Sequence, residues 1–240
     1  MECRVPKAIF FDFDNTLQDM DAAYNEAVTS TLGPVCMGSG VDLGSLMQVM
    51  AMVRAEIWTE AQRGHIRIPQ EHIYRVWFTE VFRRCQIPQP ELQAVAIEGV
   101  YRASFERGLR LFDDVLPALT ILRDSRSDIA LGILTNGPSA IQRRRIQARG
   151  LSRFMEHLVT SEDAQAAKPD ARIFRYALSM AGIGPTDAVL VGDDPTVDVA
   201  GAQAAGWHAV LIDRKGVRHE AGDAPVARDL IEACELAVAG

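Results

Sequence analysis

The sequence predicts an α/β protein in which a doubly wound parallel sheet is interrupted by a separate all-helical segment. Short apolar runs have the length of strands buried on both faces of a sheet; they lie at 7–13, 129–135, 188–192 and 208–212. Helical stretches separate the later runs, and this alternation is typical of parallel sheets. Roughly ninety residues after residue 17 contain no convincing strand, which favours a helical insertion after the first strand.

The insertion is predicted to be compact, because apolar residues recur in it at the spacing of buried helix faces. Three such stripes occur: Leu43, Leu46, Met47, Met50, Val53, Ile57 and Trp58; Ile73, Val76, Trp77, Val81 and Phe82; and Leu92, Val95, Ala96, Val100 and Ala103. The glycine-rich stretch 33–44 is predicted to be a flexible loop. Its glycines match no dinucleotide- or phosphate-binding fingerprint and follow no strand.

The later helices have recognisable ends. Asp113 and Asp114 can start a helix that has Pro117 in its first turn. A glycine follows each of three predicted helices, at the position where the left-handed conformation is favoured; these are Gly150, Gly182 and Gly206. A weaker strand is predicted at 157–160.

Composition and charge disfavour several classes of protein. With 25 basic and 32 acidic residues, the net charge is −7, which argues against a nucleic-acid polymer as partner. The four cysteines form no CxxC pair or Cys/His cluster, so we expect free thiols in a reducing compartment and no structural zinc. The sequence contains no apolar run of about 18 residues and no signal-peptide pattern. These features predict a cytoplasmic protein without a membrane span.

Residues that carry chemistry follow the predicted strands, at the edge where a doubly wound sheet binds ligands, and Lys168 precedes the helix that leads into the strand at 188–192. Taken singly, each has a plain structural explanation as a turn residue, a helix cap or a surface lysine. Taken together, several carboxylates at one edge would repel each other unless a cation or a catalytic role compensates them. The residues are Asp12, Asp14, Thr135, Asn136, Lys168, Asp193, Asp194 and Asp198.

This set predicts phosphoryl chemistry around a hard divalent cation. Asp12 and Asp193 would hold Mg²⁺, which prefers oxygen ligands. Asp12 could attack phosphorus to form an aspartyl-phosphate, while Asp14 could protonate the departing alkoxide and later activate water. The phosphoryl oxygens would be bound by a hydroxyl, a stretch of backbone and an ammonium, supplied by Thr135, Asn136 and Lys168.

With these motifs the chain resembles the haloacid dehalogenase (HAD) superfamily. The motifs are, in order, Asp12-Phe13-Asp14-Asn15-Thr16-Leu17, Leu134-Thr135-Asn136, Lys168-Pro169 and Gly192-Asp193-Asp194-Pro195-Thr196-Val197-Asp198. The resemblance implies a Rossmann-like core over 1–17 and 109–240 and a helical (C1-type) cap over 18–108.

The resemblance also implies a set of metal ligands. Mg²⁺ would be bound by Asp12, by the backbone carbonyl of Asp14 and by Asp193. Asp198 would support the metal site from behind these ligands. Asp194 is placed with Asp198 among the residues that would support the metal site. It stands where relatives often have Ser or Thr, so its own role is left open.

Asp14 indicates the reaction class within the superfamily. Phosphate esters leave as alkoxides that need a proton, whereas halides need none, so a 2-haloacid dehalogenase would lack this second aspartate. The T-N-G of 135–137 and the pattern from Lys168 to Leu178 are most similar to nucleotidases and sugar-phosphate phosphatases that bear a cap. We therefore predict a Mg²⁺-dependent phosphatase that acts through an aspartyl-phosphate on a small phosphorylated metabolite, with a pyrimidine nucleoside 5′-monophosphate favoured.

Several alternatives stay open. A phosphoglycolate or sugar-phosphate phosphatase would use the same core, and a phosphomutase would keep both aspartates. A non-catalytic binding module would be expected to have lost part of the acidic and basic set, which is complete here. We expect a monomer or homodimer whose specificity is set by the cap. The basic residues of the cap and its edges are interpreted mostly as solvated helix faces; they are Arg54, Arg63, His65, Arg67, Arg83 and Arg84.

Overall fold

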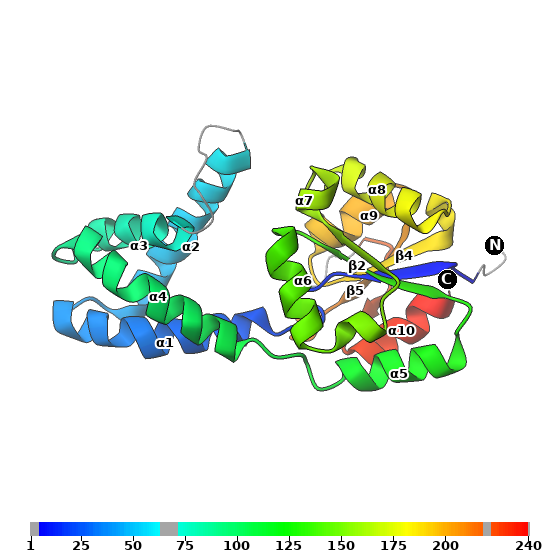
Figure 1. Ribbon diagram of the computed structural model, residues 1–240, viewed down its shortest axis with the longest axis horizontal. Helices are drawn as coiled ribbons and strands as arrows, with labels where there is room; N and C mark the ends of the chain where they lie inside the picture. Colours follow the sequence, from blue (N-terminus) through cyan, green and yellow to red (C-terminus); the bar gives the residue numbers. More distant parts are fainter. Residues whose placement is uncertain (1–4, 63–71, 218–221, 240) are drawn as a thin grey trace. The chain divides into compact units, whose positions relative to one another are not determined.

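The computed structural model describes residues 5–62, 72–217 and 222–239 (Figure 1). The chain divides into two compact units: a sheet unit, Met1–Asp19 with Arg110–Gly240, and a helical unit, Met20–Leu109. Within the sheet unit, the two segments that lead to the helical unit run side by side, because the N–H of Asp19 donates to the carbonyl of Arg110 at 2.9 Å. The helical unit is thus an insertion that begins and ends at one point of the sheet unit.

The sheet unit is built on a parallel sheet with strand order β3-β2-β1-β4-β5-β6. Its strands are β1 (Ala8–Phe11), β2 (Ala130–Thr135), β3 (His157–Thr160), β4 (Ala188–Gly192), β5 (His208–Ile212) and β6 (Val226–Ala227). β1 lies in the middle, where Phe11 pairs with Ile133 of β2 and with Val191 of β4. The predicted α/β class and doubly wound parallel sheet are confirmed, including the weak strand β3; the two-residue β6 was not predicted.

Helices cover both faces of this sheet (Figure 1). They are α5 (Val115–Ser125), α6 (Ser139–Ala148), α7 (Ser161–Ala164), α8 (Ala171–Ala181), α9 (Gly201–Ala204) and α10 (Leu230–Ala239), with shorter turns η2 (Leu151–Arg153), η3 (Pro185–Asp187) and η4 (Pro195–Ala200). The predicted helix start at Asp114 is the N-cap of α5. The three predicted glycines all adopt positive φ; Gly150, Gly182 and Gly206 have 68°, 67° and 82°.

Alternation along β1 explains how one strand supports two cores. Ile9 and Phe11 belong to an apolar cluster that includes Leu119 of α5. Phe10 points to the other face and packs in a cluster with Phe174 of α8 and with Trp207. A strand buried on both faces reads as a continuous apolar run, which is why β1 could be recognised in the sequence.

The helical unit has a core of its own. It consists of α1 (Met20–Ser39), α2 (Leu43–Gln62), α3 (Ile73–Arg84) and α4 (Pro90–Gly108). Most of the predicted stripes on α2 and α3 are confirmed, since Met50, Val81 and Phe82 are fully buried, but Val76 of α3 is 40% exposed. Around them stack aromatic rings, including those of Phe78 and Tyr101, whose centroids lie 5.0 Å apart.

Two expectations for this unit are wrong. On α4 the stripe was placed on the wrong face: Leu92 is 64% exposed, whereas Tyr101 and Phe105 of the opposite stripe are buried. The larger aromatic side chains gain more from burial than the valines and leucine do. The stretch 33–44 is also not a loop, because α1 continues to Ser39 and buries Cys36; only 40–42 interrupt the helices.

The structure describes three of the six basic residues that were interpreted mostly as solvated helix faces. Arg83 and Arg84 make surface ion pairs with Glu80 at 2.8 Å, as expected for solvated helix faces. Arg54 lies over the ring of Tyr24, 5.9 Å from its centroid. The other expected positions, Arg63, His65 and Arg67, lie outside the described residues.

In the described part of the chain, no helix taken singly has the length and apolar character needed to cross a membrane. The pair formed by Met20–Ser39 and Leu43–Ile57 meets the criterion by length and composition only, and the two are bent by 115°. Their apolar side chains, such as Leu32 and Met50, belong to the core of the helical unit.

Candidate active site

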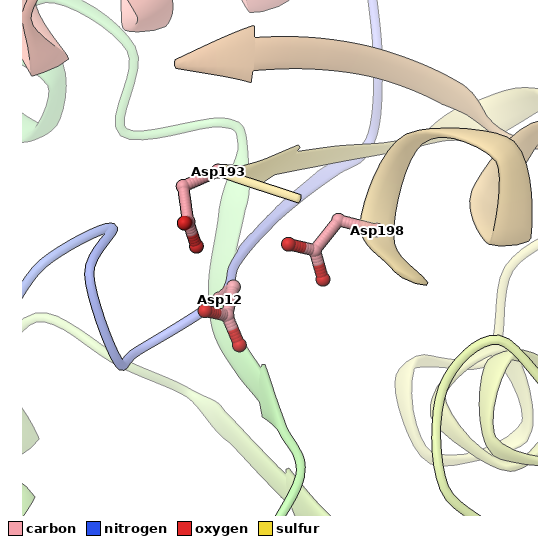
Figure 2. Close-up of side chains that lie close together, drawn as sticks. All are labelled: Asp12, Asp193 and Asp198. Carbon is pink, nitrogen blue, oxygen red and sulfur yellow. The ribbon is translucent and has the colours of Figure 1, made fainter. Parts of the chain in front are cut away.

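Three carboxylates meet at the carboxyl edge of the sheet. Asp12 directly follows β1, and its backbone N–H donates to the carbonyl of Val191 on β4 at 2.9 Å. Asp193 directly follows β4, and Asp198 lies in the π-helical turn η4. Figure 2 shows the three side chains converging, and one carboxylate oxygen of each lies within 4.8 Å of the others.

Lys168 contacts two of these carboxylates. Its Nζ donates to Oδ1 of Asp12 and to Oδ1 of Asp198, each at 2.6 Å. The Asn136 side chain holds the lysine backbone, since it accepts from the Lys168 N–H at 2.8 Å and donates to the Lys168 carbonyl at 3.1 Å. Asn136 therefore positions Lys168, a contact that sequence reasoning did not foresee.

Burial and charge act in opposite directions on this cluster. Burial raises the pKa of Asp12 well above its usual range; Asp198 and Asp193 add to the rise, and Lys168 opposes it. Burial disfavours the charged form of Lys168, but Asp12 and Asp198 outweigh burial and raise the pKa of the ammonium. The lysine therefore stays charged at neutral pH, with Asp12 and Asp198 as its direct partners.

The segment after β4 is folded tightly around Asp198. Its Oδ2 accepts the backbone N–H of Asp194 at 3.0 Å. The Asp194 carboxylate in turn caps η4, because Oδ1 accepts the N–H groups of Thr196 and Val197 at 2.8 and 2.9 Å. A Cβ on Gly192 would lie 2.5 Å from the Asp198 side chain, so only glycine fits there. The open role of Asp194 is thus answered in structural terms: its side chain caps a turn.

Asp14 lies beside two buried glutamines that sequence reasoning missed. Its Oδ1 accepts from Nε2 of Gln18 at 2.8 Å, and its Oδ2 accepts from Nε2 of Gln142 at 3.0 Å. Gln142 also donates to Oγ1 of Thr135, the last residue of β2, at 3.1 Å. The register of α6 could have revealed Gln142, which stands in the first turns of the helix that follows T-N-G. Gln18 gave no signal, because burial of a single glutamine cannot be read from a sequence.

The donor set fits a divalent cation. Asp12, Asp193 and Asp198 offer carboxylate oxygens, which are the ligands that hard cations such as Mg²⁺ prefer. Both oxygens of Asp198 already accept hydrogen bonds, one from Lys168 and one from the Asp194 backbone. Asp193 is approached by Oγ1 of the fully buried Thr16, which donates to its Oδ1 at 3.4 Å.

Comparisons with known proteins give the family and the fold of the chain. A family model of haloacid dehalogenase-like hydrolases matches residues 6–206. The glyceraldehyde 3-phosphate phosphatase of Methanopyrus kandleri is 29% identical over 209 residues, which are 87% of this chain and 84% of that protein. The HAD hydrolase YfnB of Bacillus subtilis aligns with 98% of this chain and 99% of its own at 21% identity and a TM-score of 0.75, and so shares the fold.

Two further relatives match only in part. The phosphoserine phosphatase of Thermus thermophilus is 42% identical over 95 residues, which are 40% of this chain and 38% of that protein. The pyrimidine 5′-nucleotidase YjjG of Escherichia coli is 37% identical over 109 residues, which are 45% of this chain and 48% of that protein.

The family match spans most of the chain, and the relatives described above are phosphatases. HAD proteins generally use a divalent metal, for which the acidic cluster offers oxygen ligands. The chain therefore belongs to the haloacid dehalogenase-like hydrolase family and is a phosphomonoester hydrolase.

Proposed function

We propose that the protein is a cytoplasmic, Mg²⁺-dependent phosphatase of small metabolites in which Asp12 is the nucleophile. The observation that carries this proposal is the position of Asp12. It stands at the end of the central strand, bound to the Lys168 ammonium at 2.6 Å and facing Asp193 and Asp198. The free thiols of the buried Cys36 and Cys234 favour a reducing compartment.

The reaction would run in two steps. In the first, an Asp12 oxygen forms a bond to phosphorus, the bond from phosphorus to the ester oxygen breaks, and Asp14 gives its proton to the departing oxygen. In the second, the Asp14 carboxylate takes a proton from water, whose oxygen bonds to phosphorus as the bond to Asp12 breaks. This restores both aspartates and releases phosphate.

Other residues would bind the phosphoryl group. The Thr135 hydroxyl, at the end of β2, and the Lys168 ammonium would stabilise the negative charge on its oxygens. Asn136 would act mainly through its hydrogen bonds to the Lys168 backbone. A cation held by Asp12, Asp193 and the backbone carbonyl of Asp14 supplies charge neutralisation and orients the phosphate when bound. Asp198 would keep Lys168 in place.

The helical unit is proposed to act as a cap that sets substrate choice. Its insertion begins at residue 20, shortly after the turn that contains Asp14. The relative that matches over 87% of this chain, and hence over much of this unit, acts on a triose phosphate. The pyrimidine nucleotidase matches over 45%. A sugar or triose phosphate is therefore favoured, with a pyrimidine nucleoside 5′-monophosphate as the second candidate.

The test is phosphate release from a panel of phosphomonoesters, with Mg²⁺ or with EDTA. The panel contains triose and hexose phosphates, phosphoglycolate, phosphoserine and nucleoside 5′-monophosphates. We expect activity with Mg²⁺, none with EDTA, and a loss of several orders of magnitude in Asp12→Asn. Asp12→Asn with more than a few per cent of the wild-type rate would refute the aspartyl-phosphate route. A tenfold higher kcat/KM for a nucleotide would reverse the order of the substrates and leave the phosphatase assignment intact.

A further inference from the structure

The carboxylate of Asp14 is held from two sides by buried amides. Nε2 of Gln18 donates to Oδ1 at 2.8 Å, and Nε2 of Gln142 donates to Oδ2 at 3.0 Å. Gln18 is fully buried and Gln142 is 2% exposed. Each oxygen of Asp14 thus has its own amide donor, so rotation of the carboxyl would break a hydrogen bond on either side.

Both glutamines stand on backbone that is itself fixed. The Gln18 N–H donates to the Phe13 carbonyl at 2.9 Å, and the Gln18 carbonyl accepts the N–H of Asn15 at 2.7 Å. The turn between Asp14 and Gln18 places Asn15 at φ 63°, a conformation that its short polar side chain tolerates. Gln142 lies in α6, where its N–H donates to the Pro138 carbonyl at 3.0 Å. The two donors therefore reach Asp14 from separate, well-anchored segments.

The oxygen atom of each amide is buried at a cost in stability. Oε1 of Gln18 and Oε1 of Gln142 are buried and accept no hydrogen bond from any described residue. An unpaired buried amide oxygen destabilises a fold, and an apolar side chain of similar size would avoid the penalty. The reversed orientation would bring an amide oxygen against the Asp14 carboxylate, which is repulsive. The amides thus keep an unfavourable arrangement whose only visible gain is their contact with the active-site edge.

We propose that Gln18 and Gln142 are positioning residues that hold the Asp14 carboxyl where it can protonate the leaving group. The inference rests on the proposed function, in which the Asp14 proton moves to the ester oxygen as its bond to phosphorus breaks. A proton donor must lie within hydrogen-bond reach of that oxygen, and small errors in placement are costly.

The two glutamines differ in what else they contact. Gln142 also donates to Oγ1 of Thr135 at 3.1 Å and to the Asn136 carbonyl at 3.2 Å, and so it connects Asp14 to the predicted phosphate-binding residues. The hydrogen bond from the Gln18 side chain goes to Asp14. Gln18 is therefore the cleaner probe of proton donation, and Gln142 is expected to affect phosphate binding as well.

The test compares leaving groups. Gln18→Leu and Gln142→Leu are measured with two substrates and Mg²⁺, by single-turnover release of the leaving group and, for KM, at steady state. One is the best alkyl phosphomonoester of the panel, whose alkoxide needs a proton. The other is p-nitrophenyl phosphate, whose phenolate leaves without one. The matched control is Gln147→Leu, the same substitution at an exposed position of α6.

We expect Gln18→Leu to slow release from the alkyl ester by about 10- to 100-fold, a part of the 10²- to 10⁴-fold that general acids contribute. Release from p-nitrophenyl phosphate should slow by less than about threefold, and the KM for the alkyl ester should stay within about threefold of wild type. Gln142→Leu should add a higher KM for both substrates. Gln147→Leu should match wild type.

Equal slowing of both substrates, or no slowing, would overturn the positioning role while leaving the phosphatase intact. A wild-type protein that releases neither leaving group would refute the proposed function itself and the inference with it. If Gln18→Leu does not fold, as judged by circular dichroism, Gln18→Met and Gln142→Leu carry the same comparison of leaving groups, and they overturn the role by the same result.

Discussion

Replacing Lys168 with methionine should destabilise the protein strongly and in a pH-dependent way. Lys168, Asp12 and Asp198 have side chains that are 2%, 10% and 3% exposed, so water does not replace the lost ammonium. Removing one partner of a buried ion pair costs about 3 to 5 kcal/mol in the free energy of unfolding. For a chain of this size, each kcal/mol lowers Tm by about 2 to 4 °C, so we expect a fall of about 6 to 20 °C at pH 8 with EDTA.

The pH dependence follows from Asp12. Burial already raises its pKa, and Lys168 opposes the rise, so the pKa is higher still in Lys168→Met. When an acid has a higher pKa in the folded protein than in the unfolded chain, the protein loses stability as pH rises. The loss begins above the pKa of the unfolded chain, about 3.9 for aspartate. The loss in Lys168→Met should therefore shrink between pH 8 and pH 5.5. In the wild type, the raised pKa of Lys168 keeps its contribution fully present in this range.

The assay is thermal and urea unfolding followed by circular dichroism, at both pH values and with EDTA. Lys7→Met is the matched control: Lys7 pairs with Asp187 at 2.9 Å, but its side chain is 60% exposed. We expect this control to lose about 1 kcal/mol or less. If Lys168→Met loses no more than Lys7→Met, or loses the same amount at both pH values, the buried ion pair does not have the energetic role assigned to it.

Three further predictions concern the metal site, η4 and a cysteine. In thermal shift measurements, Mg²⁺ should raise the Tm of the wild type and of Asp194→Ala but not that of Asp193→Ala, because Asp193 lies in the acidic cluster and Asp194 caps η4. Equal responses of the two variants would contradict this assignment. Asp194→Ala should lose about 1 kcal/mol of stability in urea unfolding through the lost cap, and an unchanged midpoint would argue against it. Burial raises the pKa of Cys234 to about 12, so iodoacetamide at pH 8 should alkylate this thiol only in urea, as measured by mass analysis of peptides. Rapid labelling of the native protein would refute its burial.

The sequence predicted most of the sheet unit because its strands are buried on both faces. Such strands appear as continuous apolar runs, as in β1, β2, β4 and β5, and the ends of three of them carry the predicted polar residues. The helical unit was harder. A helix in a small bundle can bury either of two apolar stripes, and on α4 the aromatic one was chosen. The helix through Gly33 and Pro34 was missed because local preference was given more weight than the buried spacing of Leu32 and Cys36.

At the site, residue types were predictable and their mutual contacts were not. Acidic residues after strands are visible in any sequence, whereas the hydrogen bonds of Gln142 and Asn136 connect segments that only the fold brings together. The hydrogen bond of Gln18 depends on the conformation of the turn that follows Asp14. Asp194 illustrates the same limit. Its neighbour Asp193 faces the cluster, while its own carboxylate turns back to cap η4, and nothing in the two adjacent letters distinguishes them.

The central place of β1 in the sheet has a consequence for how the chain folds during synthesis. β1 is made first, yet its neighbours are β2 and β4, whose paired residues begin at Ala130 and Ala188. The helical unit, Met20–Leu109, is contiguous and emerges long before either neighbour. Local helical contacts form quickly, whereas pairing across such long loops is slow. We therefore expect the insertion to be structured on the ribosome while the strand that carries the nucleophile still lacks both of its partners.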